Sequence, residues 1–352
     1  MIKKIILIGA LVALSSWFVS SSVALDNSAA SKTTEEISSA AKNFLSLLDE
    51  THRAGVVYKF TDEEQRKRWS NLPTTFVKRG GLRLGDLTKQ QRDGVQAVLM
   101  AALSPQGYQK AMEIVEGDEV LKKNDHGGPG RPNNPGGASM FGHDEYYISF
   151  VGEPSPTEPW MIQFGGHHLA INITLAGEHT TIAPTHTGSQ PATYEFEGKT
   201  VRPLGHEVDK SFALLNSLNE AQRKQAILGS EMHDLVLGPG RDGKTIQPEG
   251  IKGSDLTDKQ QEMLLDLASE WVDIMPEAAA KDKMADLKQH VSETWFTWSG
   301  PIEKPGFAYF RVQGPTVIIE YAPQTLGGDP SNHIHTIYRE PGNDYGTKWW
   351  TR

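Results

Sequence analysis

The chain has 352 residues, no cysteine, and 35 lysines and arginines against 44 aspartates and glutamates, which gives a formal net charge of −9. An acidic protein repels nucleic acid and anionic lipid, so neither is an expected partner. The lack of cysteine excludes disulfides, a thiol nucleophile and thiolate metal ligands, so the fold must depend on its hydrophobic core.

The first residues have the pattern of a secretory signal peptide. Lys3 and Lys4 precede an apolar run from Ile5 to Val19, and small residues follow up to Ala24. An apolar run of about 15 residues is shorter than the roughly 20 that cross a bilayer. We therefore expect a signal peptide over 1–24, export to the periplasm or the cell exterior, a flexible leader over 25–34, and no membrane insertion after cleavage. The oligomeric state has no signal in the sequence.

Helical periodicity runs from residue 35 to about residue 121. Its first stretch places Ile37, Phe44 and Leu48 on one apolar face. Capping boxes, in which a polar side chain and a Glu or Gln three residues later cap a helix reciprocally, mark four predicted helix starts. These pairs are Thr61 with Glu64, Thr88 with Gln91, Asn219 with Gln222, and Thr257 with Gln260.

Residues 124–142 are too rich in Gly, Pro and Asn for regular structure, and a loop of this length in a compact domain is usually functional or mobile. Alternating residues after this loop predict strands at 145–151, 160–164, 168–175 and 180–184. Helical patterns return over 208–228 and 256–291. Further strands are predicted at 294–298, 308–312 and 316–321.

Parts of the chain resemble one another. LTKQQ at 87–91 is similar to LTDKQQ at 256–261, and the hairpin sequence from Tyr147 parallels the one from Trp295. An internal duplication of 87–201 and 256–340 would explain both, although turn-rich strands can also be similar by chance. We predict a single α+β domain over 35–352, with a helical N-terminal part and two similar antiparallel hairpin or sheet units separated by helices.

Residues 238–245 fit the phosphate-loop pattern GxxxxGK[ST]. Phosphate binding by this motif needs a helix directly after it, and Pro248 and Gly250 exclude that helix. We therefore expect no nucleotide cofactor.

The histidines gather in two short windows. Seven of the 12 lie within 143–186 and 333–335: His143, His167, His168, His179, His186, His333 and His335. His333 and His335 are two residues apart on a predicted strand, so both project from the same face. His168 belongs to the polar face of its predicted strand and the adjacent His167 to the apolar face. We therefore expect His168 to be a ligand, and His167 to be buried and hydrogen-bonded to backbone.

Imidazole and carboxylate ligands without sulfur suit zinc, copper or iron. The candidate ligands are His168, His333, His335 and His186. The candidate catalytic groups are Glu145 and Glu340, as ligand or general base, and Arg339, as a contact for an anionic group or a carboxylate beside the site. Arg339 is included because it projects from the same strand face as His333 and His335. Two alternatives stay open: a metal-free cleft in which histidines bind or transfer protons to a small molecule, and purely structural histidines.

Five segments together are distinctive: GGHHLAINI from Gly165, PTHTGSQP at 184–191, DLVLGPGRDG from Asp234, PEGI from Pro248, and HIHTIYREPGNDYG from His333. They resemble the bacterial family catalogued as domain of unknown function 3500, over nearly the whole mature chain. The resemblance implies a secreted single-unit protein. It implies no activity and no catalytic residues.

The favoured function is an exported metal-dependent enzyme, in particular a hydrolase, that acts on a small-molecule substrate at a histidine-lined site. The site is expected where the hairpin at 165–186 meets the C-terminal His-x-His strand, under the loop at 124–142. The alternatives are a non-catalytic periplasmic protein that binds a small molecule or metal, and a structural envelope module.

Overall fold

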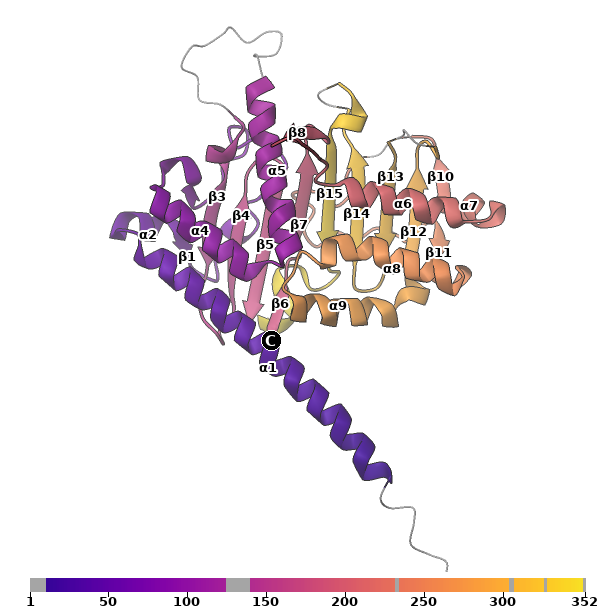
Figure 1. Ribbon diagram of the computed structural model, residues 1–352, viewed down its shortest axis with the longest axis horizontal. Helices are drawn as coiled ribbons and strands as arrows, with labels where there is room; N and C mark the ends of the chain where they lie inside the picture. Colours follow the sequence, from indigo (N-terminus) through magenta and orange to yellow (C-terminus); the bar gives the residue numbers. More distant parts are fainter. Residues whose placement is uncertain (1–10, 125–139, 232–233, 304–306, 326–327, 351–352) are drawn as a thin grey trace, which may run out of the picture.

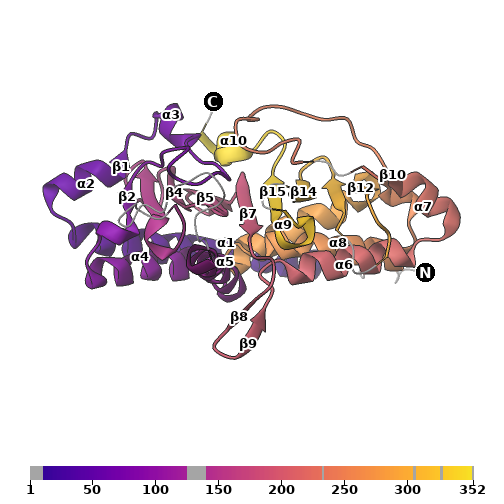
Figure 2. The same cartoon turned by 90° about the horizontal axis from the view of Figure 1, so that it is seen from above.

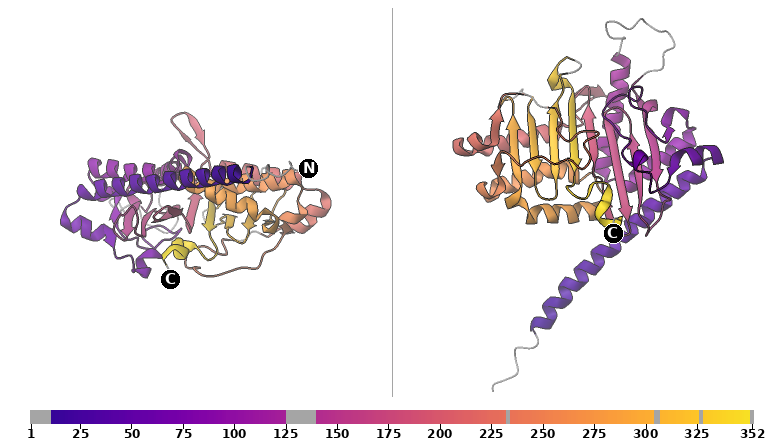
Figure 3. Two further views of the ribbon diagram at one scale, coloured as in Figure 1. Left: turned by 90° about the horizontal axis from the view of Figure 1, so that it is seen from below. Right: turned by 180° about the vertical axis from the view of Figure 1, so that it is seen from behind.

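The computed structural model describes residues 11–124, 140–231, 234–303, 307–325 and 328–350, with side chains described from residue 29 onward. Helices cover one face of a large mixed sheet, and irregular segments cross the other face (Figures 1, 2 and 3). The chain is therefore an α+β protein, which confirms the predicted fold class. Most of the loop expected at 124–142 lies outside the described residues.

Ten helices are described, and their caps follow from the sequence. They are α1 (Leu11–Ser46), α2 (Glu50–Val56), α3 (Glu63–Arg66), α4 (Lys89–Ala102), α5 (Pro105–Asn124), α6 (Gly205–Ser217), α7 (Glu220–Ala226), α8 (Asp258–Val272), α9 (Glu277–Gln289) and α10 (Thr347–Trp350). The predicted capping boxes are present at the starts of α4, α7 and α8. The prediction at Thr61 was wrong, because the side chain of Asp62 caps α3 instead.

Helix α1 includes the segment that was predicted to be a flexible leader. Residues 1–10 lie outside the described residues, and 25–34, expected to be a flexible leader, belong to α1. Thr34 and Ile37 are fully buried, so the helix is already packed against the body there. Within the described part of the chain, no helix has both the length and the apolar content needed to span a membrane.

The strands form one large sheet and one separate hairpin. The sheet contains β1 (Val57–Tyr58), β2 (Leu82–Arg83), β3 (Tyr147–Val151), β4 (Trp160–Gly165), β5 (Leu169–Ala176), β6 (His179–Thr181), β7 (Thr185–Ser189), β10 (Ile227–Gly229), β11 (Ile251–Lys252), β12 (Trp295–Ser299), β13 (Tyr309–Gln313), β14 (Ile318–Pro323) and β15 (Ile334–Arg339). The hairpin consists of β8 (Tyr194–Phe196) and β9 (Lys199–Val201).

The sheet has the same plan in both halves. Its order is β1-β3-β4-β5-β7-β15-β14-β13-β12-β10, so β7 and β15 meet at the centre. On one side β1 runs parallel to β3 and β2 antiparallel to it, and on the other side β10 and β11 pair with β12 in the same two ways. An internal duplication would give this arrangement, and the shared plan begins earlier than residues 87 and 256, at β1 and β10.

The two central strands have one face toward the helices and one face away from them. Thr187 of β7 and Thr336 of β15 are hydrogen-bonded at 2.7 Å, and the indole of Trp271 in α8 donates to Thr336 at 2.9 Å. These threonines therefore face the helices. Since side chains alternate along a strand, His186 and His335 face away from the helix layer.

Candidate metal centre

Three histidines meet where β5, β7 and β15 lie side by side. The amide of Gly188 in β7 donates to the carbonyl of His168 at 2.7 Å, and Gly188 pairs with His335 of β15. His168 and His335 thus stand on either side of a residue without a side chain. A Cβ at position 188 would lie 3.1 Å from Cδ2 of both imidazoles. Gly188 therefore leaves the space in which the rings approach each other.

The Nε2 atoms of His168, His333 and His335 converge. Nε2 of His333 lies 3.1 Å from that of His168 and 3.0 Å from that of His335. One ligand atom from each residue falls within 4.8 Å of the others, and the three residues are 1–5% exposed. Nitrogen ligands at about 2.0–2.1 Å from a tetrahedral ion lie about 3.3 Å apart. The observed spacing is close to that of ligands around one ion.

Asp118 of α5 controls the protonation of His168. Its Oδ1 accepts from Nδ1 of His168 at 3.0 Å and of His167 at 3.2 Å, while its Oδ2 accepts from the hydroxyl of Tyr146 at 3.1 Å. Burial would raise the pKa of Asp118, but the two histidines outweigh it and hold the pKa below its ordinary value. The carboxylate is therefore ionised and only accepts, so Nδ1 of His168 carries the proton and Nε2 has a free lone pair.

The electrostatics keep the imidazoles neutral. Burial, together with the neighbouring His167, lowers the pKa of His168 to about 3. Burial and the surrounding histidines also lower the pKa of His335 well below its ordinary value. Both rings are uncharged near neutral pH, which is the form that binds metal ions.

Protons alone satisfy this cluster poorly. A ring nitrogen of neutral imidazole either carries a proton or has a lone pair, never both. Because Nε2 of His168 has a lone pair, every placement of protons leaves one contact among the three Nε2 atoms either shared or unsatisfied. A single cation that accepts all three lone pairs satisfies the three atoms at once. Nδ2 of Asn71 lies 3.1 Å from Nδ1 of His335. The two ends of an amide are assigned by the hydrogen-bond network, and with the amide turned over its oxygen would accept the proton of Nδ1 and leave a lone pair on Nε2.

His186 stands beside the cluster without being part of the converging group. Its ring centroid lies 5.1 Å from that of His335, and the residue is fully buried. Neither ring nitrogen has a partner with normal hydrogen-bond geometry among the described residues, and the interaction of the ring with the backbone of Thr336 is outweighed by burial. Burial lowers the pKa of His186 to about 3, so the ring is neutral. An unpaired polar group in the interior is costly, and a hydrogen-bonding group held at the cluster would relieve that cost.

Arg79 fixes the segment that covers the cluster. Its guanidinium donates to the carbonyls of Ser70 at 2.8 Å, Leu72 at 2.7 Å and Gly166 at 2.7 Å. Burial lowers the pKa of Arg79 to about 10, so it remains charged at neutral pH. These bonds tie residues 70–79 to the turn before β5 and hold Asn71 against His335.

The three candidate catalytic groups are not part of the converging group. The carboxylate of Glu145 accepts from Arg83 at 2.7 Å and from Thr74 at 3.1 Å. Glu340 accepts from Tyr338 at 2.8 Å, beyond the far end of β15, and Arg339 pairs with Asp242 and Asp344. At about 3.3 Å per residue, Arg339 is roughly 13 Å along the strand from His335.

His167 is buried, as predicted, but its hydrogen-bond partner is not the predicted one. Residues 166–168 form a bend before β5, so the alternation of a strand does not apply to them. The rings of His167 and His168 lie 3.6 Å apart and share Asp118, and Phe141 packs against His167 at 4.9 Å. The partner of His167 is therefore a carboxylate and not a backbone group.

Asp118, Asn71 and Gly188 were not predicted as site residues. Asp118 does have a sequence signal, because it continues the spacing of Ala111 and Val115, which are buried on one face of α5. A charged residue on a buried helix stripe needs a partner. Asn71 lies in an irregular segment, where no periodicity marks it.

Comparison with known proteins gives a family and no activity. The model of a family described as protein of unknown function (DUF3500) matches residues 30–347. No curated protein and no solved structure matches the chain. Since the family match covers most of the sequence, the chain belongs to the DUF3500 family.

Proposed function

We propose that this member of the DUF3500 family binds one divalent transition-metal ion through Nε2 of His168, His333 and His335, and uses it to hydrolyse a small-molecule substrate. The convergence of three imidazoles supports this proposal most directly. Three histidine ligands with one remaining position for water are the donor set of catalytic zinc sites, whereas structural sites are closed by four protein ligands. Zinc, copper and iron all accept imidazole ligands.

Each neighbouring residue has a role in this proposal. A bound ion would lower the pKa of a water molecule in the fourth position to about 7. Asp118 orients His168 and increases its basicity, and Asn71 would do the same for His335 with its amide oxygen turned toward Nδ1. His186, with two unpaired ring nitrogens, would accept a hydrogen bond from the group in the fourth position. We place export to the periplasm or cell exterior within the same proposal, on the basis of residues 1–24.

A second function, non-catalytic metal binding, is favoured by one observation. The three imidazoles are at most 5% exposed, so a bound ion would be shielded from solvent. A storage or structural ion needs no open position, whereas hydrolysis does.

Metal analysis of the exported, untagged protein tests the metal site. We expect about one zinc, copper or iron ion per chain in the wild type, and none in the His333→Ala, His335→Ala double variant. His179→Ala is a matched control, because His179 stacks on Trp349 at 5.2 Å and is not one of the three converging histidines. A wild type that is folded but binds none of these ions contradicts the proposal.

Cobalt(II) substitution separates the two functions. Azide added to the cobalt protein should change its visible absorption if a position on the ion is open to exchange. An unchanged spectrum would exclude hydrolysis at the ion and support non-catalytic binding.

A further inference from the structure

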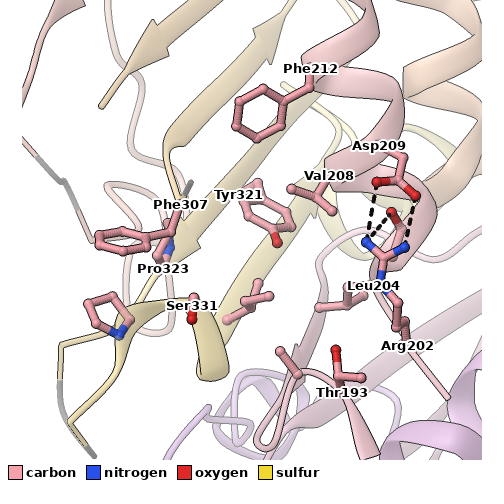
Figure 4. A pocket seen from close by; sticks show the side chains of 14 residues that line it. Thr193, Arg202, Leu204, Val208, Asp209, Phe212, Phe307, Tyr321, Pro323 and Ser331 are labelled. Atoms are coloured by element: carbon pink, nitrogen blue, oxygen red, sulfur yellow. Dashed lines mark hydrogen bonds and ion pairs between the residues drawn. The ribbon is translucent and has the colours of Figure 1, made fainter. Parts of the chain in front are cut away.

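A pocket lies on the helix side of the sheet, next to β14 and β15. It encloses about 390 Å³, which is within the size range of small-molecule sites. Apolar side chains line it from α6, from strands β14 and β15, and from the segments just before α6, β13 and β15, as Figure 4 shows. The six largest are Leu204, Val208, Phe212, Phe307, Tyr321 and Ile334.

This pocket is separate from the histidine cluster. Ile334 lines the pocket and lies between His333 and His335 in the sequence. Since successive side chains of a strand point to opposite faces, the pocket and the cluster occupy opposite sides of β15. Tyr321 pairs with Thr336, which faces the helices, so Tyr321 is on the pocket side as well.

The hydroxyl of Tyr321 is a polar group that faces this pocket. Tyr321 is 2% exposed, and its ring stacks on Phe310 at 4.8 Å, which fixes its orientation. The hydroxyl makes no hydrogen bond to any residue that the structure describes, and in Figure 4 it points toward the space between Ser331 and Leu204. A tyrosine hydroxyl that faces a pocket and has no protein partner is available to a ligand.

The charges at the pocket compensate each other. Nη1 and Nη2 of Arg202 donate to the two carboxylate oxygens of Asp209 at 2.9 and 3.2 Å. Because this bidentate pair neutralises the guanidinium, Arg202 offers no unpaired cation to an anionic ligand. The walls therefore suit an uncharged molecule with a flat apolar body, and the free hydroxyl suits a hydrogen-bond acceptor on that body.

We propose that this pocket binds an uncharged aromatic small molecule that carries a carbonyl group, with the hydroxyl of Tyr321 donating to the carbonyl oxygen. Phe212, Phe307 and Leu204 would enclose the ring. The site goes beyond the proposed metal-dependent function, and its occupancy does not depend on a bound ion.

The test compares two probes of similar shape by ligand-observed NMR titration. Acetophenone has the carbonyl oxygen and ethylbenzene lacks it. The wild type should bind acetophenone about three- to tenfold more tightly, the ratio that one hydrogen bond gives. In Tyr321→Phe the preference should disappear while the affinity for ethylbenzene stays within about twofold of wild type.

Variants of α6 supply the position control. Val208→Trp should fill the pocket and abolish binding of both probes, whereas Ala213→Trp, at an exposed position of the same helix, should leave both affinities unchanged. If the wild type binds neither probe, or if Tyr321→Phe keeps the preference for acetophenone, the proposal is wrong. The Val208→Trp result decides the matter if the tyrosine variant does not fold.

Discussion

At the scale of single residues, the carboxylate of Asp118 organises the cluster. It is 1% exposed and accepts from two imidazoles and a tyrosine hydroxyl. Through one hydrogen bond it decides which nitrogen of His168 carries the proton. The free Nε2 of that ring, and with it the capacity to bind a cation, depends on a residue that would not touch the ion.

We expect Asp118→Asn to weaken metal binding by about 10- to 100-fold, the usual cost of removing a partner that orients a metal ligand. The amide is nearly the same size, but it has no negative charge to hold the protons of His167 and His168 at Nδ1, and its nitrogen cannot accept from Tyr146. Competition with a chromophoric chelator measures the affinity. Glu116→Gln, which removes a surface partner of His143, is the control. Equal affinity in wild type and Asp118→Asn would show that the carboxylate does not orient the ligand.

The buried neutral histidines predict a pH dependence. Burial lowers the pKa of His186 to about 3, below its ordinary value of 6.5, so between these values the unfolded chain binds a proton that the folded chain does not. Stability from this group is therefore fully present above pH 6.5 and is lost as the pH falls toward 3. Each such histidine contributes a slope of about 1.4 kcal/mol per pH unit.

We expect the free energy of unfolding of the metal-free protein to fall between pH 6.5 and 5. His186→Gln should fall less steeply, by about 1.4 kcal/mol per pH unit, because one titrating group is gone. Urea unfolding at a series of pH values measures both slopes. Parallel slopes for the two proteins would mean that His186 is protonated in the folded state.

At the scale of secondary structure, strand β7 explains what the sequence could and could not predict. Its residues, Thr185–Ser189, include no large apolar side chain, although the strand is central and buried. Hydrophobic periodicity therefore gave no signal for it. The register with β5 and β15 comes from pairing between distant segments, and this register brings His168 opposite His335.

Other expectations succeeded or failed for equally local reasons. The capping boxes at Thr88, Asn219 and Thr257 were predictable, because each depends on four consecutive residues. The prediction that His333 and His335 project from the same strand face was also local, because it depends only on their spacing of two residues. Alternation along a strand tells which face a side chain projects from, but not how far apart two side chains are. Arg339 was therefore grouped with histidines that lie at the other end of β15.

Gly188→Ala tests the role of β7 as a spacer. The new Cβ would lie 2.9 Å from the carbonyl of Ile334 and 3.1 Å from two imidazoles. We expect loss of metal binding and about 1–3 kcal/mol lower stability from overpacking. Gly229→Ala is the control, because no atom lies within 4 Å of its added Cβ. Full metal content in Gly188→Ala would show that the rings need no such gap.

At the scale of the whole molecule, the cluster joins the two similar halves of the sheet. His168 comes from the first half, and His333 and His335 come from the second. The parallel between Gly166 and Gly314 places Pro315 and Thr316 where the first half has His167 and His168. The second half therefore lacks the corresponding imidazoles, and one site per chain is expected.

An ion held between the halves should stabilise the folded chain. At a free metal concentration about a thousandfold above the dissociation constant, the gain is about 4 kcal/mol. Removal of the ion with a chelator should lower the urea midpoint of the wild type. The His333→Ala, His335→Ala variant should not respond to the same treatment. Identical midpoints for loaded and stripped wild type would mean that no ion bridges the halves.

X-ray absorption at the edge of the bound metal tests the central claim most directly. The account predicts three imidazole nitrogens at about 2.0–2.1 Å and one further light atom. Imidazole rings have a distinct outer-shell scattering pattern, so they can be told from carboxylates. An ion surrounded mainly by carboxylate oxygens, with no imidazole scattering, would contradict the assignment of His168, His333 and His335 as its ligands.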